Sequence, residues 1–198
     1  MNIGLFFGSF NPIHTGHLLI ASQVVELTPL KQIWFVVSPQ NPLKPKETLL
    51  NQYDRLHLVQ LAVEDDNRFK ASNVEFAMPV PSYTIDTLTW LSEKYPKHQF
   101  SLIMGADNLD TIHKWKNYEA LLKHYHIYVY QRQGHAITAK WKEQPNVTVC
   151  EFPLLDISAT YIRECVQKGI SLRYLVPDRV REYIETYHLF QKKSTENL

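Results

Sequence analysis

The sequence has few of the features that mark several common classes of protein. It holds only two cysteines, Cys150 and Cys165, and their spacing suits neither a metal site nor a disulfide framework. We therefore expect two free thiols, buried or half-buried, in a reducing compartment. No uncharged apolar run approaches the roughly 18–20 residues that cross a bilayer, and no basic segment with an apolar segment and a cleavage site opens the chain. A cytoplasmic protein with no membrane partner is expected.

An excess of charge of either sign is also lacking. The chain has 21 Lys and Arg against 20 Asp and Glu, for a formal net charge of +1. This balance gives no reason to expect nucleic acid as a partner, so any bound anion must be held by a few well-placed groups. The length of 198 residues and the 44% hydrophobic content fit one globular domain. We place that domain at residues 1–190 and expect 191–198 to be a frayed tail.

Short β-rich runs alternate along the chain with segments of helical period, which is typical of a parallel, doubly wound α/β sheet. Six strands are expected, at 2–7, 32–38, 69–78, 98–107, 126–132 and 146–152. Helices are expected behind the first strand, after Asn51, from about Thr84 to Lys94, through Trp115 to Lys123, from Ser158 to Gly169 and after Pro177. The pattern therefore predicts the α/β class.

The stretch GSFNPIHTGH, residues 8–17, follows the first expected strand. In an open parallel sheet, ligands bind beyond the carboxyl ends of the strands. Gly8 and Gly16 let the backbone come close to a ligand, and the start of the next helix offers free N–H groups to a phosphate. His14 and His17 are three residues apart and should face the same way. The stretch therefore predicts a phosphate-binding turn with two imidazole donors.

Two other interpretations of this histidine pair remain open. Both rings could have a purely structural role, as single histidines often do. They could also bind a metal ion, although no acidic or thiolate third ligand stands nearby in the sequence.

Four motifs carry a resemblance to a known family. His14-Thr15-Gly16-His17 resembles the (H/T)xGH signature of the nucleotidylyltransferase superfamily, and ISATYIRE at 157–164 resembles a second motif of that superfamily. PSYTIDTL at 81–88 and MGADNLDTIHKW at 104–115 resemble segments of the bacterial nicotinate-mononucleotide adenylyltransferases. The resemblance implies a Rossmann-like fold and an enzyme of NAD biosynthesis. Such an enzyme joins ATP and nicotinate mononucleotide to give nicotinate adenine dinucleotide (deamido-NAD) and pyrophosphate.

The chain departs from the family pattern at two places. Asn11 stands where the family usually has Asp before the proline of the turn. The family's Pro-Pro-His-Lys loop is matched by Asn-Pro-Leu-Lys at 41–44, so its histidine is missing. The phosphate role of this loop therefore depends on Lys44, with Lys46 as a second candidate and a solvated surface lysine as the alternative.

The implied reaction needs alignment of the attacking oxygen with the α-phosphorus and neutralisation of charge on the leaving pyrophosphate. His14, His17, Lys44 and Arg163 are the expected catalytic residues, and all are donors to phosphate. Mg²⁺ is expected as the cofactor, carried on the ATP phosphates with no protein ligand. For Arg163, an ordinary surface position is the alternative.

Further binding residues follow from the resemblance. The residues expected at ATP are Gly8, Ser9, Phe10, Gly16, Gly105, Asp107, Ile157, Ser158 and Thr160. Ser158 and Thr160 would bring hydroxyls to a helix N-terminus, and Asp107 would accept bonds from ribose hydroxyls. Helix capping is the alternative for Ser158 and Asp107. Arg132 could flank the nucleotide.

Nicotinate mononucleotide is expected at Asn11, Tyr83, Thr84 and Trp115. The resemblance brings Tyr83 and Thr84 close to the substituent of the pyridine ring, and a helix starting near Thr84 prefers an anion to a neutral amide. We therefore expect nicotinate to be preferred over nicotinamide. Trp115 would stack on the pyridine ring, with an ordinary core position as the alternative.

Two rival functions remain. One is another transferase of the superfamily, acting on phosphopantetheine or a cytidylyl acceptor. The other is a non-catalytic nucleotide sensor. The sequence does not determine the oligomeric state, and a homo-oligomer is one of the alternatives.

Overall fold

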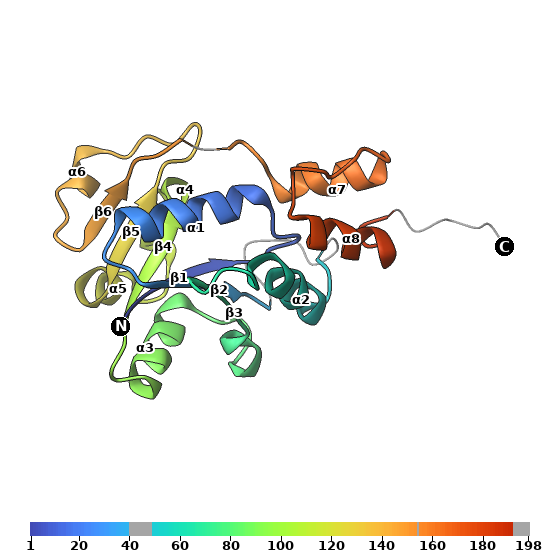
Figure 1. The fold of residues 1–198 in the computed structure, drawn as a ribbon. Coiled ribbons are helices and arrows are strands. Elements are labelled where there is room, and N and C mark those ends of the chain that lie inside the picture. The colour runs from blue at the N-terminus through green and yellow to red at the C-terminus, as the bar shows by residue number, and fades with distance from the viewer. Residues whose placement is uncertain (40–48, 154, 192–198) are drawn as a thin grey trace.

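The chain forms a six-stranded sheet in a computed structural model that describes residues 1–39, 49–153 and 155–191 (Figure 1). The strand order is β3-β2-β1-β4-β5-β6, and every pairing is parallel. This order reverses between β1 and β4, as in a Rossmann fold, and it confirms the doubly wound sheet that the sequence predicts. The strands are β1 (Asn2–Gly8), β2 (Gln32–Val37), β3 (Phe69–Ser72), β4 (Gln99–Gly105), β5 (His126–Tyr130) and β6 (Val147–Cys150).

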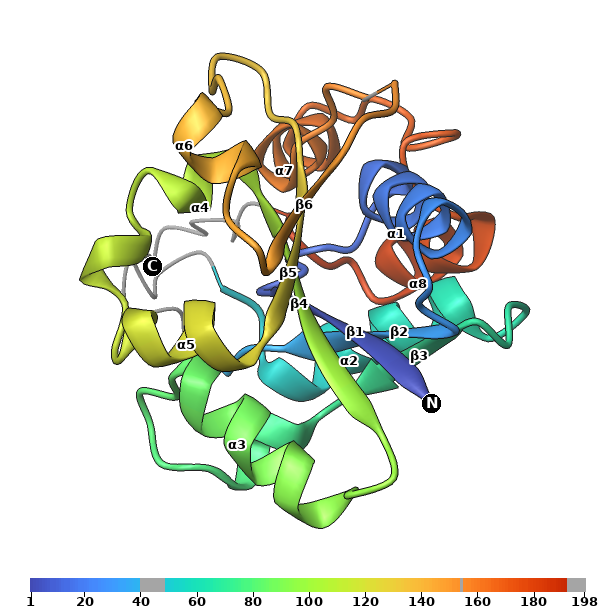
Figure 2. The ribbon, with the colours of Figure 1, turned by 90° about the vertical axis from the view of Figure 1, so that its left-hand side faces the viewer.

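Helices cover both faces of the sheet, which Figure 2 shows nearly edge-on. One face carries α1 (Thr15–Leu27), α2 (Gln52–Val63), α7 (Ala159–Gln167) and α8 (Asp178–Thr186). The other carries α3 (Thr84–Lys94), α4 (Ala106–Leu109) and α5 (Tyr118–His124), with the 3-10 helix η3 (Ile112–Lys114). A further 3-10 helix, η2 (Val74–Ala77), follows β3, and α6 (Ala139–Lys142) precedes β6.

Alternation along the strands divides the apolar side chains between two cores. Leu5 of β1 packs in the core beneath α3 and α5, whereas Phe6 packs in the core beneath α1 and α2. Trp34 and Phe35 of β2 divide in the same way. Neighbouring side chains of a strand point to opposite faces, so a strand covered on both faces reads as a continuous apolar run. The runs LFF and WFVV are therefore what this sheet requires.

The third strand is shorter than the sequence predicts. The expected strand at 69–78 ends at Ser72, and residues 74–77 form η2 instead. β3 lies at the edge of the sheet and pairs with β2 alone, in a ladder whose last pair is Val36 with Ser72. Since β2 itself ends at Val37, the chain after Ser72 has no partner strand and leaves the sheet. Two further differences concern helices. No helix was expected where α6 forms, and the single helical region expected through Trp115 to Lys123 is divided among α4, η3 and α5.

Two side-chain caps and one glycine lie where the sequence places helix ends. Ser158 accepts a hydrogen bond of 3.1 Å from the Tyr161 amide at the start of α7, and Asn51 accepts one of 2.9 Å from the Tyr53 amide at the start of α2. Gly169, with a φ of +67°, follows α7 in the left-handed conformation that suits glycine. The boundaries of both helices are thus fixed by local chemistry.

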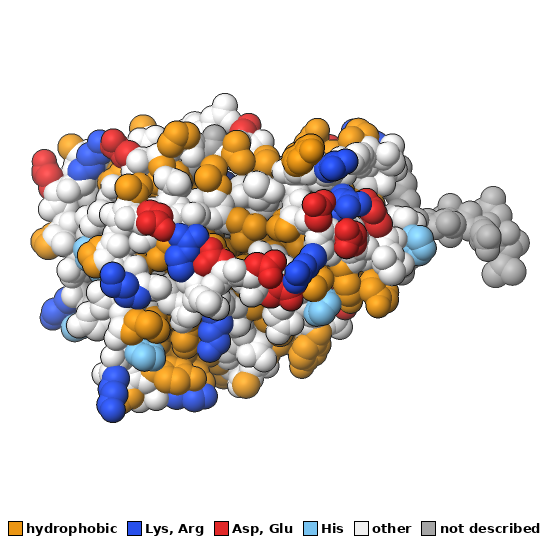
Figure 3. All heavy atoms as spheres, in the orientation of Figure 1, with side chains coloured by type: hydrophobic (Ala, Val, Ile, Leu, Met, Phe, Trp, Pro, Cys, Tyr) orange, Lys and Arg blue, Asp and Glu red, His pale blue; other side chains and the backbone are white. Residues whose placement is uncertain are grey.

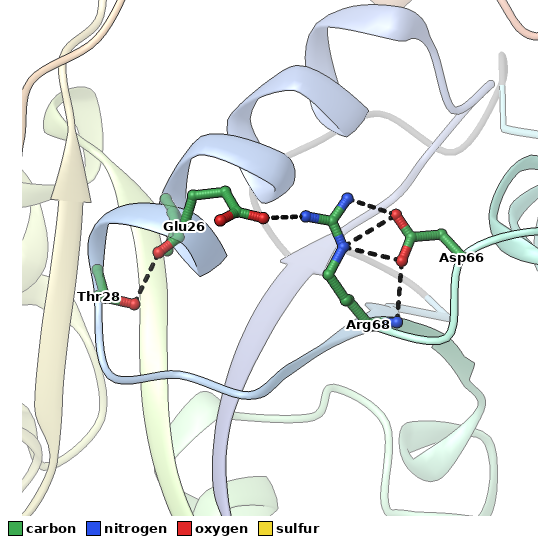
Figure 4. A network of polar contacts seen from close by, with 5 residues as sticks. Glu26, Thr28, Asp66 and Arg68 are labelled. Carbon is green, nitrogen blue, oxygen red and sulfur yellow. Dashed lines mark hydrogen bonds and ion pairs between the residues drawn. The ribbon is translucent and has the colours of Figure 1, made fainter.

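Ion pairs join neighbouring elements on the surface. Figure 4 shows Arg68, just before β3, between Asp66 and Glu26 of α1, with 2.6 Å between Arg68 Nη2 and Asp66 Oδ2. On the face drawn in Figure 3, acidic and basic side chains are interspersed. No helix in the described part of the chain is both long and apolar enough to cross a membrane.

Candidate active site

The turn between β1 and α1 lies at the carboxyl end of the central strand. Gly8 ends β1, and its carbonyl accepts a hydrogen bond of 2.9 Å from the Ser38 amide, which follows β2. Phe10 has a φ of +43°, and its buried ring contacts Phe6 and Phe35 in the core. A Cβ on Gly8 would lie 2.8 Å from that ring, so the turn needs glycine there. Any contact of Phe10 with ATP would have to come from its backbone.

His14 and His17 stack on each other at the start of α1. Their ring centroids are 3.6 Å apart, with 29° between the ring planes. The His14 amide donates to His17 Nδ1 over 3.3 Å. Because Nδ1 of His17 accepts this bond, the proton of its neutral ring is on Nε2. The structure therefore brings the two predicted imidazoles together, with an Nε2–H donor on His17.

His14 is more deeply buried than a surface donor would be. It is 5% exposed, and its Nδ1 is shielded from solvent beside the first turn of α1. Burial, assisted by the positive charge of Arg132, lowers the pKa of His14 from 6.5 to about 4. The ring is therefore neutral near pH 7. A neutral imidazole at the ligand-binding edge of such a sheet carries one N–H donor that suits a phosphate oxygen.

Arg163 reaches the same turn from α7. Its Nη1 donates to the Asn11 carbonyl over 2.8 Å, and its Nη2 donates to Thr160 Oγ1 over 3.2 Å. Burial lowers the pKa of this half-buried guanidinium, which nevertheless stays charged at neutral pH. Asn11 and Arg163 are 152 residues apart in the chain, yet the fold places them in contact. α1 and α7 also lie on the same side of the sheet in Figure 2.

Arg55 holds this edge of the sheet together, and the sequence motifs do not include it. The side chain is fully buried, and its guanidinium donates to four backbone carbonyls. The acceptors are Ser9 at 2.6 Å, Ser38 at 2.8 Å, Pro39 at 3.0 Å and Leu50 at 3.0 Å. Burial lowers its pKa to about 10. One cation thus joins the residues that follow β1 and β2 to the residues before α2.

The sequence did carry a signal for the burial of Arg55. Leu58 and Val59 stand three and four residues further along α2, so helical spacing puts Arg55 on the same buried face. Asn11 belongs to this network as well, since its Oδ1 accepts a hydrogen bond of 3.1 Å from the Leu50 amide. The asparagine that replaces the usual aspartate therefore has a role in positioning the turn.

A cavity of about 460 Å³ opens beside β1 and β4; we call it the α3 cavity. Tyr83, Thr84 and Trp115 line it, as do the chain at Gly8 and Ser9, Gly105 and the buried Glu75. The structure therefore brings together three of the four residues predicted to bind the mononucleotide. The fourth, Asn11, is not part of this lining. Above Tyr83, Lys116 Nζ lies 4.9 Å from the ring centroid and pairs with Asp86 at 2.7 Å.

A second cavity, of about 710 Å³, lies beside the start of α7; we call it the α7 cavity. Asp107, Arg132, Ile157 and Ser158 line it, all of them named from the sequence at ATP or beside the nucleotide. Arg132 Nε lies 3.5 Å from Asp107 Oδ1. The buried Tyr130 lines both cavities, so they adjoin at the end of β5.

Gly16 and Gly105, the other two glycines named from the sequence, also lie against site residues. A Cβ on Gly105 would stand 2.3 Å from Asp107 Oδ1, and one on Gly16 would stand 3.0 Å from His14 Nδ1.

Within residues 1–39, 49–153 and 155–191, no group of three His, Cys, Asp or Glu side chains could hold a metal ion. Lys44 and Lys46 lie outside the described residues, as do residues 192–198 of the expected tail.

Comparison with known proteins identifies the family. A family model described as cytidylyltransferase-like matches residues 5–165. A probable nicotinate-nucleotide adenylyltransferase of Cytophaga hutchinsonii is 52% identical over 184 residues, which are 93% of this chain and 95% of the relative. One of Flavobacterium johnsoniae is 49% identical over 193 residues, which are 97% of this chain and 100% of the relative. The chain belongs to the cytidylyltransferase-like family and, within it, to the nicotinate-nucleotide adenylyltransferases.

Solved structures support the fold of this family member. The nicotinic acid mononucleotide adenylyltransferase of Plasmodium falciparum, complexed with NaAD, aligns with a TM-score of 0.81 at 21% identity. The alignment covers 96% of this chain and 97% of that one. A putative nicotinate-nucleotide adenylyltransferase of Vibrio parahaemolyticus aligns with a TM-score of 0.69 at 17% identity, covering 97% and 96% of the two chains. The adenylyltransferase fold is thus common to all three proteins.

Proposed function

We propose that this chain transfers the adenylyl group of ATP to nicotinate mononucleotide, giving nicotinate adenine dinucleotide and pyrophosphate in NAD biosynthesis. The observation that carries the proposal is the stacked pair of His14 and His17 at the reversal point of the sheet. Two adjoining cavities at the same edge provide room for two nucleotides. The names of the relatives agree with this reaction.

The mechanism needs no protein nucleophile, because the phosphate of the mononucleotide is itself ionised. One of its oxygens forms a bond to the α-phosphorus of ATP. The bond from that phosphorus to the bridging oxygen breaks, and pyrophosphate leaves with the electron pair. His17 donates its Nε2–H to an α-phosphate oxygen, and the neutral ring of His14 supplies a second N–H. One preorganised donor of this kind contributes about 3–4 kcal/mol to the transition state.

Cationic and hydroxyl groups hold the leaving phosphates. Arg163 binds them from α7, together with the hydroxyls of Ser158 and Thr160 at the helix N-terminus. Lys44 binds phosphate from the 40–48 segment. Imidazole, guanidinium and hydroxyl donors suit phosphate oxygens better than a metal ion, so we propose that Mg²⁺ enters with ATP as part of the substrate. There it neutralises charge on the pyrophosphate.

The α3 cavity receives the mononucleotide. Trp115 stacks on the pyridine ring, and the N-terminus of α3 at Thr84 faces its substituent. The first amides of a helix are unpaired and carry the positive end of the dipole, so they prefer a carboxylate to a carboxamide. We propose the cytoplasm as the location, because both cysteines are buried and unpaired, as in proteins of a reducing compartment.

Pyrophosphate release tests this function. The protein is incubated with ATP and Mg²⁺, and with nicotinate mononucleotide, nicotinamide mononucleotide or phosphopantetheine in turn. We expect the fastest release with nicotinate mononucleotide, about tenfold faster or more than with nicotinamide mononucleotide at equal concentration. Release with phosphopantetheine alone would assign the chain to another branch of the superfamily. Binding of ATP without release for any acceptor would favour the nucleotide sensor.

A further inference from the structure

Glu75 is a buried carboxyl that none of the motifs includes. It lies in η2, is 2% exposed and borders the α3 cavity. Its Oε1 accepts a hydrogen bond of 2.9 Å from Thr87 Oγ1. Its Oε2 is shielded from solvent, and the hydroxyls of Ser82 and Ser38 lie near the carboxyl. A carboxyl of this kind needs an explanation, because ionisable groups are rarely buried without a role.

Thr87 connects this carboxyl to the start of α3. It is fully buried in the first turn of the helix, two residues after Ile85. Its hydroxyl also lies 3.3 Å from the Tyr83 carbonyl and 3.5 Å from Met78 Sδ. A single hydroxyl therefore joins η2, the connection that follows it and the residue that precedes α3. The same turn begins at Thr84, which borders the cavity.

The other polar contact of this turn is weaker. Asp86 pairs with Lys116 at 2.7 Å, but both side chains are more than 40% exposed. Water and salt screen an exposed pair of this kind, and its contribution is small. The buried bond between Glu75 and Thr87 is protected from this competition and limits the position of the turn more strongly.

We propose that Glu75 is a positioning residue that determines acceptor specificity: through Thr87 it fixes the first turn of α3 against the cavity that takes the pyridine mononucleotide. The inference depends on the proposed function. A carboxylate ligand gains from the helix terminus only if the first amides are held at hydrogen-bonding distance, because the attraction falls off within one turn. Loss of the Glu75–Thr87 bond should therefore weaken binding of the acceptor. It should leave binding of ATP unchanged, because Asp107, Ile157 and Ser158, which are predicted to bind ATP, line the α7 cavity away from this bond.

The charge state of Glu75 is compatible with this role. Burial raises the pKa of its carboxyl, while the hydroxyls of Thr87, Ser82 and Ser38 act in the opposite direction. A raised pKa reduces the negative charge beside the helix terminus, where an ionised carboxylate would repel an anionic ligand.

Steady-state kinetics of four variants test the inference. In Glu75→Ala and in Thr87→Val we expect the KM for nicotinate mononucleotide to rise about tenfold, with the KM for ATP within about twofold of wild type. The ratio of kcat/KM for nicotinate over nicotinamide mononucleotide should fall by a similar factor. Glu75→Gln keeps an oxygen for Thr87 and should restore the wild-type KM. The double variant Glu75→Ala/Thr87→Val should be no worse than either single change.

Thr89→Val is the matched control. Thr89 is an exposed residue of the same helix, and its hydroxyl donates to the Ile85 carbonyl at 2.9 Å without contacting Glu75. It should change neither KM. If Glu75→Ala does not fold, as melting curves will show, Thr87→Val decides the test alone. An unchanged acceptor KM, or an equal rise in both KM values, would overturn the inference. A wild-type protein without acceptor-dependent pyrophosphate release would instead refute the proposed function.

Discussion

The imidazole of His14 couples the stability of the protein to pH. Its pKa is lowered to about 4 in the folded chain, against an ordinary value of 6.5. A group with a lowered pKa of this kind binds more protons in the unfolded state than in the folded state between these values. Its contribution to stability is therefore fully present above pH 6.5 and is lost as the pH falls towards 4.

We expect His14→Asn to remove part of this pH dependence. Asparagine does not titrate, and it is a favourable residue before the first turn of a helix. Between about pH 7.5 and about pH 5, wild type should lose about 2 kcal/mol more unfolding free energy than the variant. Urea unfolding at the two pH values measures the difference. His124→Asn, at an exposed position, should behave as wild type, and equal losses in wild type and His14→Asn would refute the pKa argument.

Sequence patterns located some site residues well and missed others. The pair His14 and His17 could be predicted from spacing alone, because a helix start fixes which residues share a face. Arg55 and Glu75 could not be placed at the site in this way. Their importance comes from contacts with backbone carbonyls and with a hydroxyl that the fold supplies, and no local motif records such contacts.

At the scale of elements, one residue at the N-terminus of α7 has two predicted roles, capping the helix and binding phosphate. Ser158 caps the helix through the Tyr161 amide, and it also lines the α7 cavity. We expect Ser158→Ala to lower the unfolding free energy by about 1 kcal/mol through loss of the cap. If the hydroxyl also binds phosphate, the KM for ATP should rise about threefold to tenfold. Thermal unfolding and initial-rate kinetics measure the two effects.

Asn51→Ala provides the comparison for this variant. Asn51 caps α2 in the same way but lines neither cavity, so its loss should cost similar stability without an effect on the KM for ATP. Equal KM values in Ser158→Ala and wild type would limit Ser158 to the capping role.

Elements with strong local signals were predictable, and the exceptions have a structural cause. Strands with apolar runs and helices with caps at Asn51 and Ser158 lie where the sequence places them. The strand expected at 69–78 was too long, because its end depends on where β2 ends, and a partner strand distant in sequence determines that. The short α6 has no side-chain cap and no buried residue, so no periodic pattern of apolar residues predicts it.

At the scale of the whole molecule, the α3 cavity and the α7 cavity meet beside Tyr130. A ligand that fills both gains the contacts of each cavity but loses translational freedom only once. We therefore expect nicotinate adenine dinucleotide to bind about tenfold or more tightly than either AMP or nicotinate mononucleotide alone. Isothermal titration of the three ligands measures this. If the affinity for the dinucleotide does not exceed that for the tighter-binding of the two mononucleotides, one ligand cannot span the two cavities.

The central claim is that the stacked imidazoles act on the phosphate that reacts. Measurement of kcat in His17→Ala tests it most directly, with acceptor affinity determined by titration and with the exposed His124→Ala as control. The account predicts that kcat falls about 100-fold or more in His17→Ala, while acceptor affinity stays within about threefold of wild type. A folded His17→Ala protein that turns over at the wild-type rate would contradict it.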